Sequence, residues 1–182
     1  GVICEPLVSV GDKVRLGQII GDSQKGLCCP VHSSVSGTVK AVEPRWNPNG
    51  NKVMSVVIEN DFEDRHFEDC IPCKKNFDKL SREEIIDGAR RFGIVGMGGA
   101  GFPLFAKLRT AVESRCDTVI INGAECEPFI TCDHRAMIEY PRYIAGGIKL
   151  IMQCLGVEDA VLAIEDNKPD AIDSMKITCE GT

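Results

Sequence analysis

The sequence lacks a long apolar run and lacks an excess of positive charge. No stretch approaches the ~18 apolar residues that a membrane-spanning helix requires. The most apolar candidate, residues 143–164, is interrupted by Lys149, Gln153, Glu158 and Asp159. The 182 residues carry a formal net charge of −6, and lysine and arginine form no stripe. These features argue against a direct membrane span, against a polybasic membrane anchor and against nucleic acid as a partner.

Sequence motifs for protein-bound metal are also missing. The three histidines, His32, His66 and His134, lie far apart, and no H-x-x-H or H-E-x-x-H motif occurs. Ten cysteines are present, but C-x-x-C occurs once, at Cys70-Ile-Pro-Cys73, and the C-x-x-C-x-x-C-x-x-x-C-P spacing of bacterial iron–sulfur sites does not occur. Because a tetrahedral site needs four ligands, we expect no metal site here. We expect most cysteines to be reduced thiols packed as small apolar side chains.

The two ends of the sequence are abrupt. There is no initiator methionine and no signal-peptide pattern at the amino terminus. The first residues, from Gly1, already form a strand-like run, and the last two are Gly181 and Thr182. We therefore expect this chain to be a portion of a longer protein.

What the sequence does contain is a glycine-rich stretch, Gly93-Ile-Val-Gly-Met-Gly-Gly-Ala-Gly-Phe-Pro103, followed by an expected helix over residues 104–112. Its glycines at 96, 98, 99 and 101 permit positive φ and close approach of a ligand to the backbone. Successive N–H groups in such a loop bind anions, and the start of the following helix adds its dipole. Lys107, one turn into that helix, adds a positive charge. The stretch predicts a site for a phosphate-bearing cofactor; the alternative is a tight turn ahead of a helix.

The residues before these glycines do not fit an ordinary dinucleotide-binding motif, which has a strand at that place. Ser81 and Glu84 form a capping box, and Ile85, Ile86 and Ala89 give one apolar helical face. A helix therefore precedes the loop and leaves few residues for a strand. This order favours a different nucleotide or flavin loop over the Rossmann loop.

Residues 1–60 are predicted to be β structure. Turn residues alternate with strand-like segments, which we place at 8–10, from 18 onward, across 31–42 and at 52–59. The pattern V-x-x-G-D-x-V-x-x-G-Q-x-I followed by S-G-T-V resembles the biotinyl/lipoyl-type barrel-sandwich hybrid. In such carriers a hairpin lysine holds the prosthetic group. Lys25 lies near that place, but neither Met-Lys-Met nor Asp-Lys-Ala surrounds it, so we expect a structural barrel.

The rest of the chain changes character. Residues 61–80 are charged and aperiodic, as in a linker. From residue 81 helices alternate with short apolar strands, an order that predicts a doubly wound α/β sheet. In such sheets ligands bind beyond the carboxyl ends of the strands, where the motifs 122–127 and 165–166 lie. The expected elements are strands at 117–122 and 160–164 and helices at 141–155 and 167–175.

Three motifs in order resemble known electron-transfer proteins. The segment 96–103 with Lys107 resembles the flavin loop of the NADH-oxidising subunit of respiratory complex I. The segment Asn122-Gly-Ala-Glu-Cys-Glu-Pro128 is similar to the second flavin motif of that family. The exact residues of this motif, and those of the later segment Ile164-Glu-Asp-Asn-Lys-Pro169, resemble the RnfC subunits of Rnf electron-transport complexes. This resemblance extends over nearly the whole chain.

The resemblance implies an α+β fold with two domains. A biotinyl/lipoyl-like barrel-sandwich hybrid is expected over residues 1–60, and residues 61–80 form the linker. Residues 81–182 are expected to form a doubly wound α/β flavin/NADH-binding domain of the complex I type, with its carboxyl-terminal part missing.

The resemblance also implies FMN and NAD(H) as cofactors. By this resemblance the glycine loop and Lys107 hold the flavin phosphate, and Asn122 with neighbouring carbonyls bonds the isoalloxazine edge. Glu125 and Glu127 lie along the flavin and nicotinamide, whereas Phe102 stacks near the adenine. Since hydride passes between cofactors, no catalytic side chain is expected. The cofactor-binding set is Gly96, Gly98, Gly99, Ala100, Gly101, Phe102, Lys107, Asn122, Glu125, Glu127, Glu165 and Asp166, the last of which helps hold the dinucleotide. The alternative for the carboxylates is a solvated loop or a helix cap.

The sequence departs from these families in several places. The complex I protein has an aspartate where Ala124 stands and a second stacking aromatic where Thr110 stands. A later asparagine–threonine flavin motif and the cysteine motifs for two four-iron clusters do not occur in this sequence. We therefore expect part of a cofactor site here, 4Fe–4S clusters only in the complete protein, and no activity from this chain alone.

The function implied is electron transfer between NAD(H) and iron–sulfur carriers such as ferredoxin. The partners would be the other subunits of a membrane complex, with this protein peripheral on the cytoplasmic side of the bacterial inner membrane. Two alternatives stay open. One is a soluble carrier with the same domains that feeds a reductase such as proline reductase; the other is a non-enzymatic carrier or scaffold built on the barrel.

Overall fold

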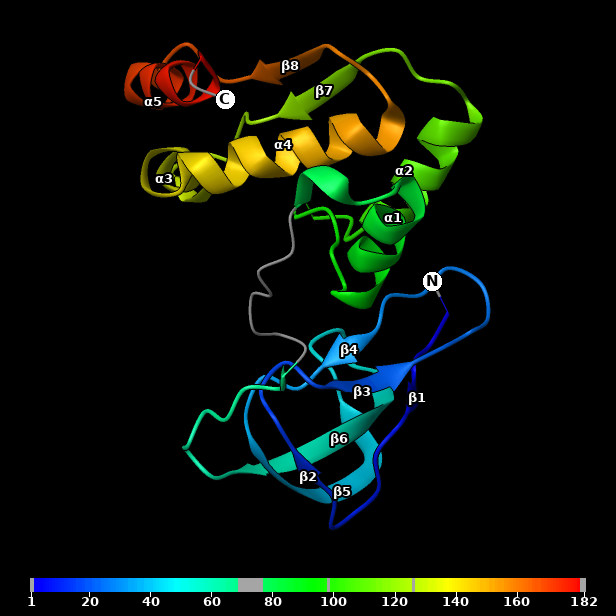
Figure 1. Cartoon of the computed structure of the whole chain (residues 1–182). Coiled ribbons are helices and arrows are strands. Elements are labelled where there is room, and N and C mark those ends of the chain that lie inside the picture. The colour runs from blue at the N-terminus through cyan, green and yellow to red at the C-terminus, as the bar shows by residue number, and fades with distance from the viewer. Residues whose placement is uncertain (1, 69–76, 98, 126, 181–182) are drawn as a thin grey trace. The chain divides into compact units, whose positions relative to one another are not determined.

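The computed structural model of this protein describes residues 2–68, 77–97, 99–125 and 127–180. The chain divides into two compact units (Figure 1). The first unit comprises Gly1–Asn76 and Asp87–Lys107, and the second comprises Phe77–Ile86 and Leu108–Thr182. The glycine-rich loop therefore belongs to the same unit as the amino-terminal β structure.

Two antiparallel three-stranded sheets build the β part of the first unit. In one sheet the order is β1-β3-β4, and in the other it is β2-β5-β6. Inward-facing valine and isoleucine side chains fill the space between them, with Val14, Ile20 and Val39 buried at the centre. The predicted barrel-sandwich hybrid is confirmed. Its strands are β1 (Glu5–Pro6), β2 (Lys13–Val14), β3 (Ile19–Asp22), β4 (Val31–His32), β5 (Gly37–Trp46) and β6 (Lys52–Asn60).

The strand expected at residues 8–10 is wrong, because a turn occupies this place. Asp12 accepts a hydrogen bond from the Ser9 N–H through Oδ2 (2.8 Å), and its own N–H donates to the Ser9 carbonyl (3.1 Å). A short acidic side chain that bonds nearby backbone competes with strand pairing. The apolar side chain of Val8 still packs against the core.

The start of the expected linker is tied into the first unit. The buried Ser36 hydroxyl donates to Asp61 Oδ1 (2.6 Å), and Arg65 Nη2 lies 2.7 Å from Asp61 Oδ2. The hydrogen bond from Ser36, followed by that from Arg65, lowers the pKa of Asp61 to about 2. Leu16 exchanges backbone hydrogen bonds with Arg65 and Phe67 (both 2.9 Å). The remainder, 69–76 with its C-x-x-C pair, lies outside the described residues, so the expected domain boundaries stay a prediction.

Helix α1 (Arg82–Arg91) begins as predicted. The Glu84 carboxylate accepts hydrogen bonds from the N–H and the hydroxyl of Ser81, both at 2.8 Å, and the Glu84 N–H donates to Ser81 Oγ (3.3 Å). The reciprocal bonds confirm the capping box. The expected apolar face is also buried, since Ile85, Ile86 and Ala89 are each at most 9% exposed.

The second unit contains a parallel pair of strands, β7 (Val119–Asn122) and β8 (Ala160–Ala163). Helices α3 (Cys132–Glu139), α4 (Pro141–Leu155) and α5 (Pro169–Glu180) pack with them, and both strands point toward α3 and α5 (Figure 1). Met137, Ala171 and Met175 form the buried centre of this unit. The parallel pair and its helices agree with the predicted α/β order.

The predicted bounds of α4 are confirmed at both ends. Pro141 occupies the first turn, where its missing N–H costs nothing, and Gly156 ends the helix with φ 71°. The short helix α3 was not predicted. Among the described helices, none combines the length and the apolar character needed to cross a membrane.

Candidate functional site

The glycine-rich loop is closed at its base by backbone pairing. The Gly96 N–H donates to the Phe102 carbonyl and the Leu104 N–H to the Ile94 carbonyl, each at 2.9 Å. An antiparallel bridge between Val95 and Pro103 lies between these bonds. The pairing fixes the two ends of the loop and starts helix α2 (Leu104–Glu113) directly after it.

The tip of this loop is open and rich in free N–H groups. Gly99 has φ 97° and Gly101 has φ 59°, and a Cβ added at either would meet no atom within 4 Å. Within the described part of the chain, the N–H groups of Gly99, Ala100 and Gly101 donate to no other group. Gly98 lies outside the described residues. Exposed N–H groups in such a turn form a concavity for an anion.

Lys107 supplies the positive charge expected beside this loop. Its Nζ lies 2.9 Å from the position that a Cβ on Gly96 would occupy, so the ammonium lies against the loop backbone. A side chain at residue 96 would displace it. Phe102, at the other end of the loop, is 44% exposed. The geometry thus combines backbone donors, one ammonium and one aromatic ring in the first unit.

The acidic motifs lie in the second unit, after the parallel strands. Asn122 ends β7, and its Oδ1 accepts the Ala124 N–H at 3.1 Å. The Gly123 N–H donates to the Ala163 carbonyl at 2.8 Å and extends the pairing with β8. Because the strands are parallel, the loop after β7 and the turn after β8 leave the same edge of the sheet.

Glu125 is the most buried of the predicted carboxylates, with its side chain 4% exposed. Oε1 accepts the Asp133 N–H at 2.9 Å, and Oε2 has no hydrogen-bond partner among the described residues and lies 3.7 Å from Lys168 Nζ. Burial alone would raise the pKa of Glu125. The N–H groups of Asp133 and His134, the Cys132 thiol and the Lys168 ammonium outweigh burial and hold that pKa below its ordinary value.

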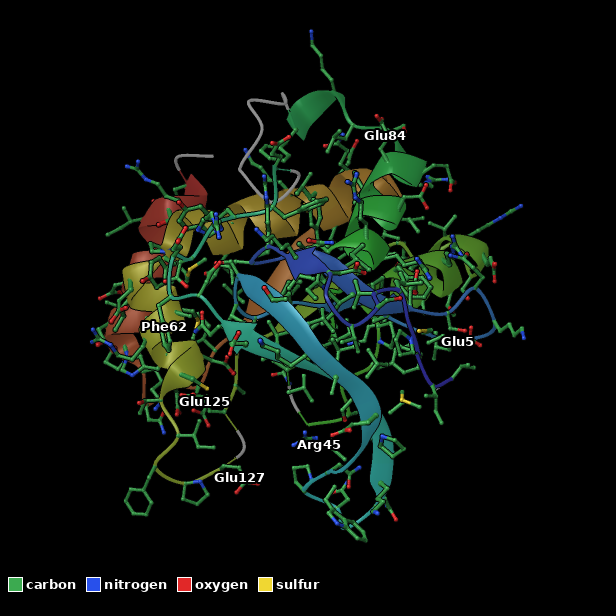
Figure 2. All side chains as sticks on the ribbon, turned by 90° about the horizontal axis from the view of Figure 1, so that it is seen from below. Glu5, Arg45, Phe62, Glu84, Glu125 and Glu127 are labelled. Atoms are coloured by element: carbon green, nitrogen blue, oxygen red, sulfur yellow. The ribbon has the colours of Figure 1, made fainter. Side chains whose placement is uncertain are left out.

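This arrangement gives Glu125 a structural task at the start of α3. A carboxylate there is favoured by the free N–H groups of the first turn and by the helix dipole. The ligand atoms of Glu125, Cys132 and Asp133 lie within 4.8 Å of one another, but the α3 N–H groups and Lys168 already engage the carboxylate. Figure 2 shows Glu125 beside α3 and Glu127 farther out on the same loop.

The remaining predicted carboxylates are less constrained. Glu127 and Asp166 are exposed, and Glu165 is half-buried. The Glu165 carbonyl accepts the Lys168 N–H at 3.1 Å, which places Lys168 over the turn after β8. Lys168 thereby joins the two acidic loops through its contact with Glu125.

A Lys168→Met substitution should destabilise the second unit, because the buried Glu125 carboxylate loses its counter-ion. We expect the melting temperature to fall by about 3 °C at pH 7, with Lys176→Met on the exposed part of α5 as the control. Glu125 has a lowered pKa in the fold, so its stabilisation is present above its ordinary pKa of 4.5 and is lost as the pH falls through the folded value. The difference in melting temperature between wild type and Lys168→Met should therefore become smaller below pH 4.5. A gap that stays constant with pH would contradict this ion pair.

The structure gathers the predicted residues into two sets. The glycine loop, Phe102 and Lys107 lie together in the first unit, and Asn122, Glu125, Glu127, Glu165 and Asp166 lie on adjoining loops of the second. Lys168 was missed by sequence reasoning. Its signal was present in the motif that follows β8, where one lysine stands three residues after Glu165.

Two family models match this chain. The model described as the RnfC Barrel sandwich hybrid domain matches residues 1–63, and the model described as the Nuo51 FMN-binding domain matches residues 89–182. The first covers the β sheets of the first unit. The second covers the glycine loop and both acidic motifs.

Curated relatives match along nearly the whole chain. The C subunit of the proton-translocating ferredoxin:NAD(+) oxidoreductase complex of Clostridium ljungdahlii is 41% identical over 182 residues, which are 100% of this chain and 40% of that protein. The C subunit of the Na(+)-translocating ferredoxin:NAD(+) oxidoreductase complex of Acetobacterium woodii is 42% identical over 175 residues, 96% of this chain and 39% of that protein. The C subunit of an ion-translocating oxidoreductase complex of Klebsiella pneumoniae is 39% identical over 183 residues, 99% of this chain and 23% of that protein.

The chain thus spans about two fifths of the length of the first two relatives, and less of the third. Both domain matches follow in the order that the sequence resemblance implied. The chain therefore belongs to the Nuo51 FMN-binding domain family and, with the RnfC barrel sandwich hybrid domain ahead of it, is part of an RnfC-like subunit.

Proposed function

We propose that this chain holds FMN through its glycine-rich loop and forms part of a subunit that passes electrons between NAD(H) and iron–sulfur carriers. The observation that supports this most is the open space beside Gly99 and Gly101, together with the Lys107 ammonium against Gly96. An ordinary tight turn has no need for several free N–H groups and a cation at one place.

The loop fits a phosphate in shape and in charge. Gly99 and Gly101 both have left-handed conformations, and a Cβ added at either would meet no atom within 4 Å. A phosphate there would accept charge-assisted hydrogen bonds from the backbone and from Lys107. The start of α2 directly after the loop adds a favourable dipole.

The polar groups proposed for the flavin ring lie in the second unit. Asn122 uses its Oδ1 for the turn to Ala124, which leaves its amide N–H groups as donors toward a ring carbonyl. Bound FMN supplies the ability to take up hydride from NADH and to release electrons singly. Glu125, held by Lys168 and α3, fixes the loop that carries Asn122 and Glu127.

The exposed groups are assigned to the dinucleotide. The carboxylates of Glu127, Glu165 and Asp166 can accept hydrogen bonds from ribose hydroxyls or from a carboxamide. The accessible ring of Phe102 can stack on adenine, and aromatic stacking on a base is worth roughly 1–3 kcal/mol. No side chain of this chain is assigned a proton-transfer role.

The wider role is proposed from the names of the relatives. Those proteins are subunits of ferredoxin:NAD(+) oxidoreductase or ion-translocating oxidoreductase complexes. We propose the same setting here, with 4Fe–4S clusters in the complete gene product, ferredoxin or a similar iron–sulfur protein as partner, and a peripheral place on the cytoplasmic side of the membrane. This chain alone is expected to be inactive as an oxidoreductase.

The test is the absorption spectrum of the complete gene product that contains this chain, purified without added cofactor. We expect a flavin band that bleaches on anaerobic addition of NADH. A flavin-free protein that stays colourless after incubation with FMN would contradict the proposal and favour the scaffold alternative. Bleaching together with co-purification of the other members of the complex would separate the membrane complex from a free carrier that feeds a reductase.

A further inference from the structure

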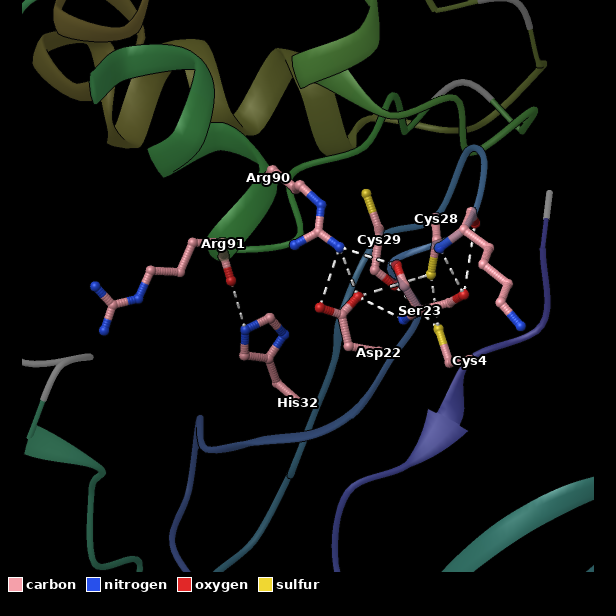
Figure 3. A network of polar contacts seen from close by, with 9 residues as sticks. Cys4, Asp22, Ser23, Cys28, Cys29, His32, Arg90 and Arg91 are labelled. Atoms are coloured by element: carbon pink, nitrogen blue, oxygen red, sulfur yellow. Dashed lines mark hydrogen bonds and ion pairs between the residues drawn. The ribbon is translucent and has the colours of Figure 1, made fainter. Parts of the chain in front are cut away.

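A pair of thiols lies in the first unit, away from the glycine-rich loop in the sequence. Cys4 Sγ and Cys28 Sγ are 3.2 Å apart and share a hydrogen bond (Figure 3). Cys28 is buried, with 4% of its surface exposed, whereas Cys4 is partly accessible. The Cys4 thiol also donates to the Cys29 carbonyl at 3.2 Å. A disulfide requires about 2.05 Å between the sulfurs, so a shift of roughly 1 Å would join them.

The backbone around the two thiols holds them together. Glu5, the residue after Cys4, pairs with Asp22 in the antiparallel ladder of β1 and β3. On the other side, the Val2 N–H donates to the Leu27 carbonyl at 3.0 Å, directly before Cys28. Both thiols are thus flanked by hydrogen-bonded neighbours, so the backbone pairing holds the two cysteines side by side.

The thiol pair is connected to an ion pair that anchors α1. Cys28 Sγ lies 3.9 Å from Asp22 Oδ1, and Arg90 Nη2 contacts both Asp22 oxygens at 2.8 and 3.1 Å (Figure 3). Burial, and then the hydrogen bond with Cys28, raise the pKa of the Cys4 thiol to about 11. The Cys4 thiol therefore stays protonated at neutral pH.

We propose that Cys4 and Cys28 are a reversible dithiol–disulfide site that reacts with low-molecular-weight disulfides. The accessible Cys4 sulfur first loses its proton, which alkaline pH favours, and its thiolate attacks such a disulfide. A mixed disulfide forms, and the small thiolate that leaves takes up a proton. The Cys28 sulfur then attacks Cys4, and the second small thiol leaves. In sum two S–H bonds and one small-molecule S–S bond are lost, one protein S–S bond and two small-molecule S–H bonds form, and two electrons pass to the small disulfide.

Oxidation would close a covalent loop between the amino-terminal segment and the turn that precedes β4. Such a loop lowers the entropy of the unfolded chain, so the oxidised protein should be the more stable form. Asp22 would lose its weak donor from Cys28 and keep the hydrogen bonds from Arg90 and from the Ser23 N–H. Neither FMN nor NADH takes part in this reaction.

The experiment is native oxidation of the 182-residue chain with glutathione disulfide, followed by alkylation of remaining thiols and trypsin digestion. Cleavage at lysine and arginine separates Cys4, in peptide 1–13, from Cys28 and Cys29, in peptide 26–40. We expect mass spectrometry to find these two peptides joined, and dithiothreitol to release them. Their absence after oxidation would overturn the proposal.

The Cys29→Ser and Cys28→Ser variants are a matched pair. The linked peptides should persist in Cys29→Ser and disappear in Cys28→Ser. A link that survives in Cys28→Ser would show that Cys29 is the partner and would overturn the assignment. As an independent readout, the oxidised wild type should melt roughly 5–10 °C above the reduced protein, a difference that should vanish in Cys28→Ser. Equal melting temperatures for oxidised and reduced wild type would also count against the site.

Discussion

A Gly99→Val variant of the complete gene product is expected to be purified without flavin. The valine Cβ would project into the open space beside the loop, where the proposed phosphate lies. The backbone at φ 97° also costs a branched side chain about 1–2 kcal/mol, which favours a change in loop conformation. We expect FMN affinity to fall at least roughly 100-fold, because both the shape and the N–H donors are disturbed.

Gly11→Val is the matched control for backbone strain. Gly11 has φ 95°, and a Cβ there also meets no atom within 4 Å, but it lies in a turn of the β part with no proposed ligand. Both variants should lose similar stability in thermal melts, whereas only Gly99→Val should lose flavin. Stoichiometric flavin in purified Gly99→Val would make the loop a structural turn and refute its assignment.

A Gly37→Ala variant is expected to disrupt the first unit. A Cβ on Gly37 would lie 2.0 Å from the Glu59 carbonyl oxygen and 3.0 Å from its carbon. Gly37 pairs with both Val14 and Asn60, so the clash cannot be relieved without opening β2-β5-β6. We expect the free energy of unfolding to fall by at least about 3 kcal/mol in urea denaturation.

Gly50→Ala is the control for this clash, because it places a Cβ on a left-handed residue without a steric contact. Gly50 has φ 75° in the turn between β5 and β6, and a Cβ there would meet open space. It should cost about 1 kcal/mol. If Gly37→Ala and Gly50→Ala lower the free energy of unfolding equally, the strands at Gly37 do not approach as closely as the structure shows.

Local sequence signals predicted those helix ends of this protein that are set by capping residues. The Ser81–Glu84 capping box marked the start of α1, and Pro141 with Gly156 marked both ends of α4. Each signal concerns backbone groups that the helix itself leaves unpaired. Such signals need no knowledge of the surrounding fold.

Elements set by distant contacts were harder to predict. The apolar residues at 8–10 suggested a strand, but the side chain of Asp12 bonds the Ser9 N–H and forms a turn. Helix α3 has no side-chain cap from Thr131. Its first turn is instead satisfied by Glu125, seven residues before its first residue, a partner that sequence periodicity cannot reveal.

The candidate site also has a part that local sequence predicts and a part that depends on distant contacts. The glycine spacing and Lys107 were predictable, because backbone conformation and charge are encoded within a dozen residues. The ion pair between Glu125 and Lys168 joins loops after two different strands. It could be found only once β7 and β8 were known to be parallel neighbours.

The most direct test of the phosphate-holding loop is titration of the flavin-depleted gene product with FMN and with riboflavin, which lacks the phosphate. Flavin fluorescence gives both affinities, and Lys176→Ala serves as the charge control for Lys107→Ala. We predict that wild type and Lys176→Ala bind FMN at least roughly 100-fold more tightly than riboflavin, and that Lys107→Ala reduces this ratio about tenfold. Equal affinities for the two flavins, or a ratio unchanged by Lys107→Ala, would contradict a phosphate site at this loop.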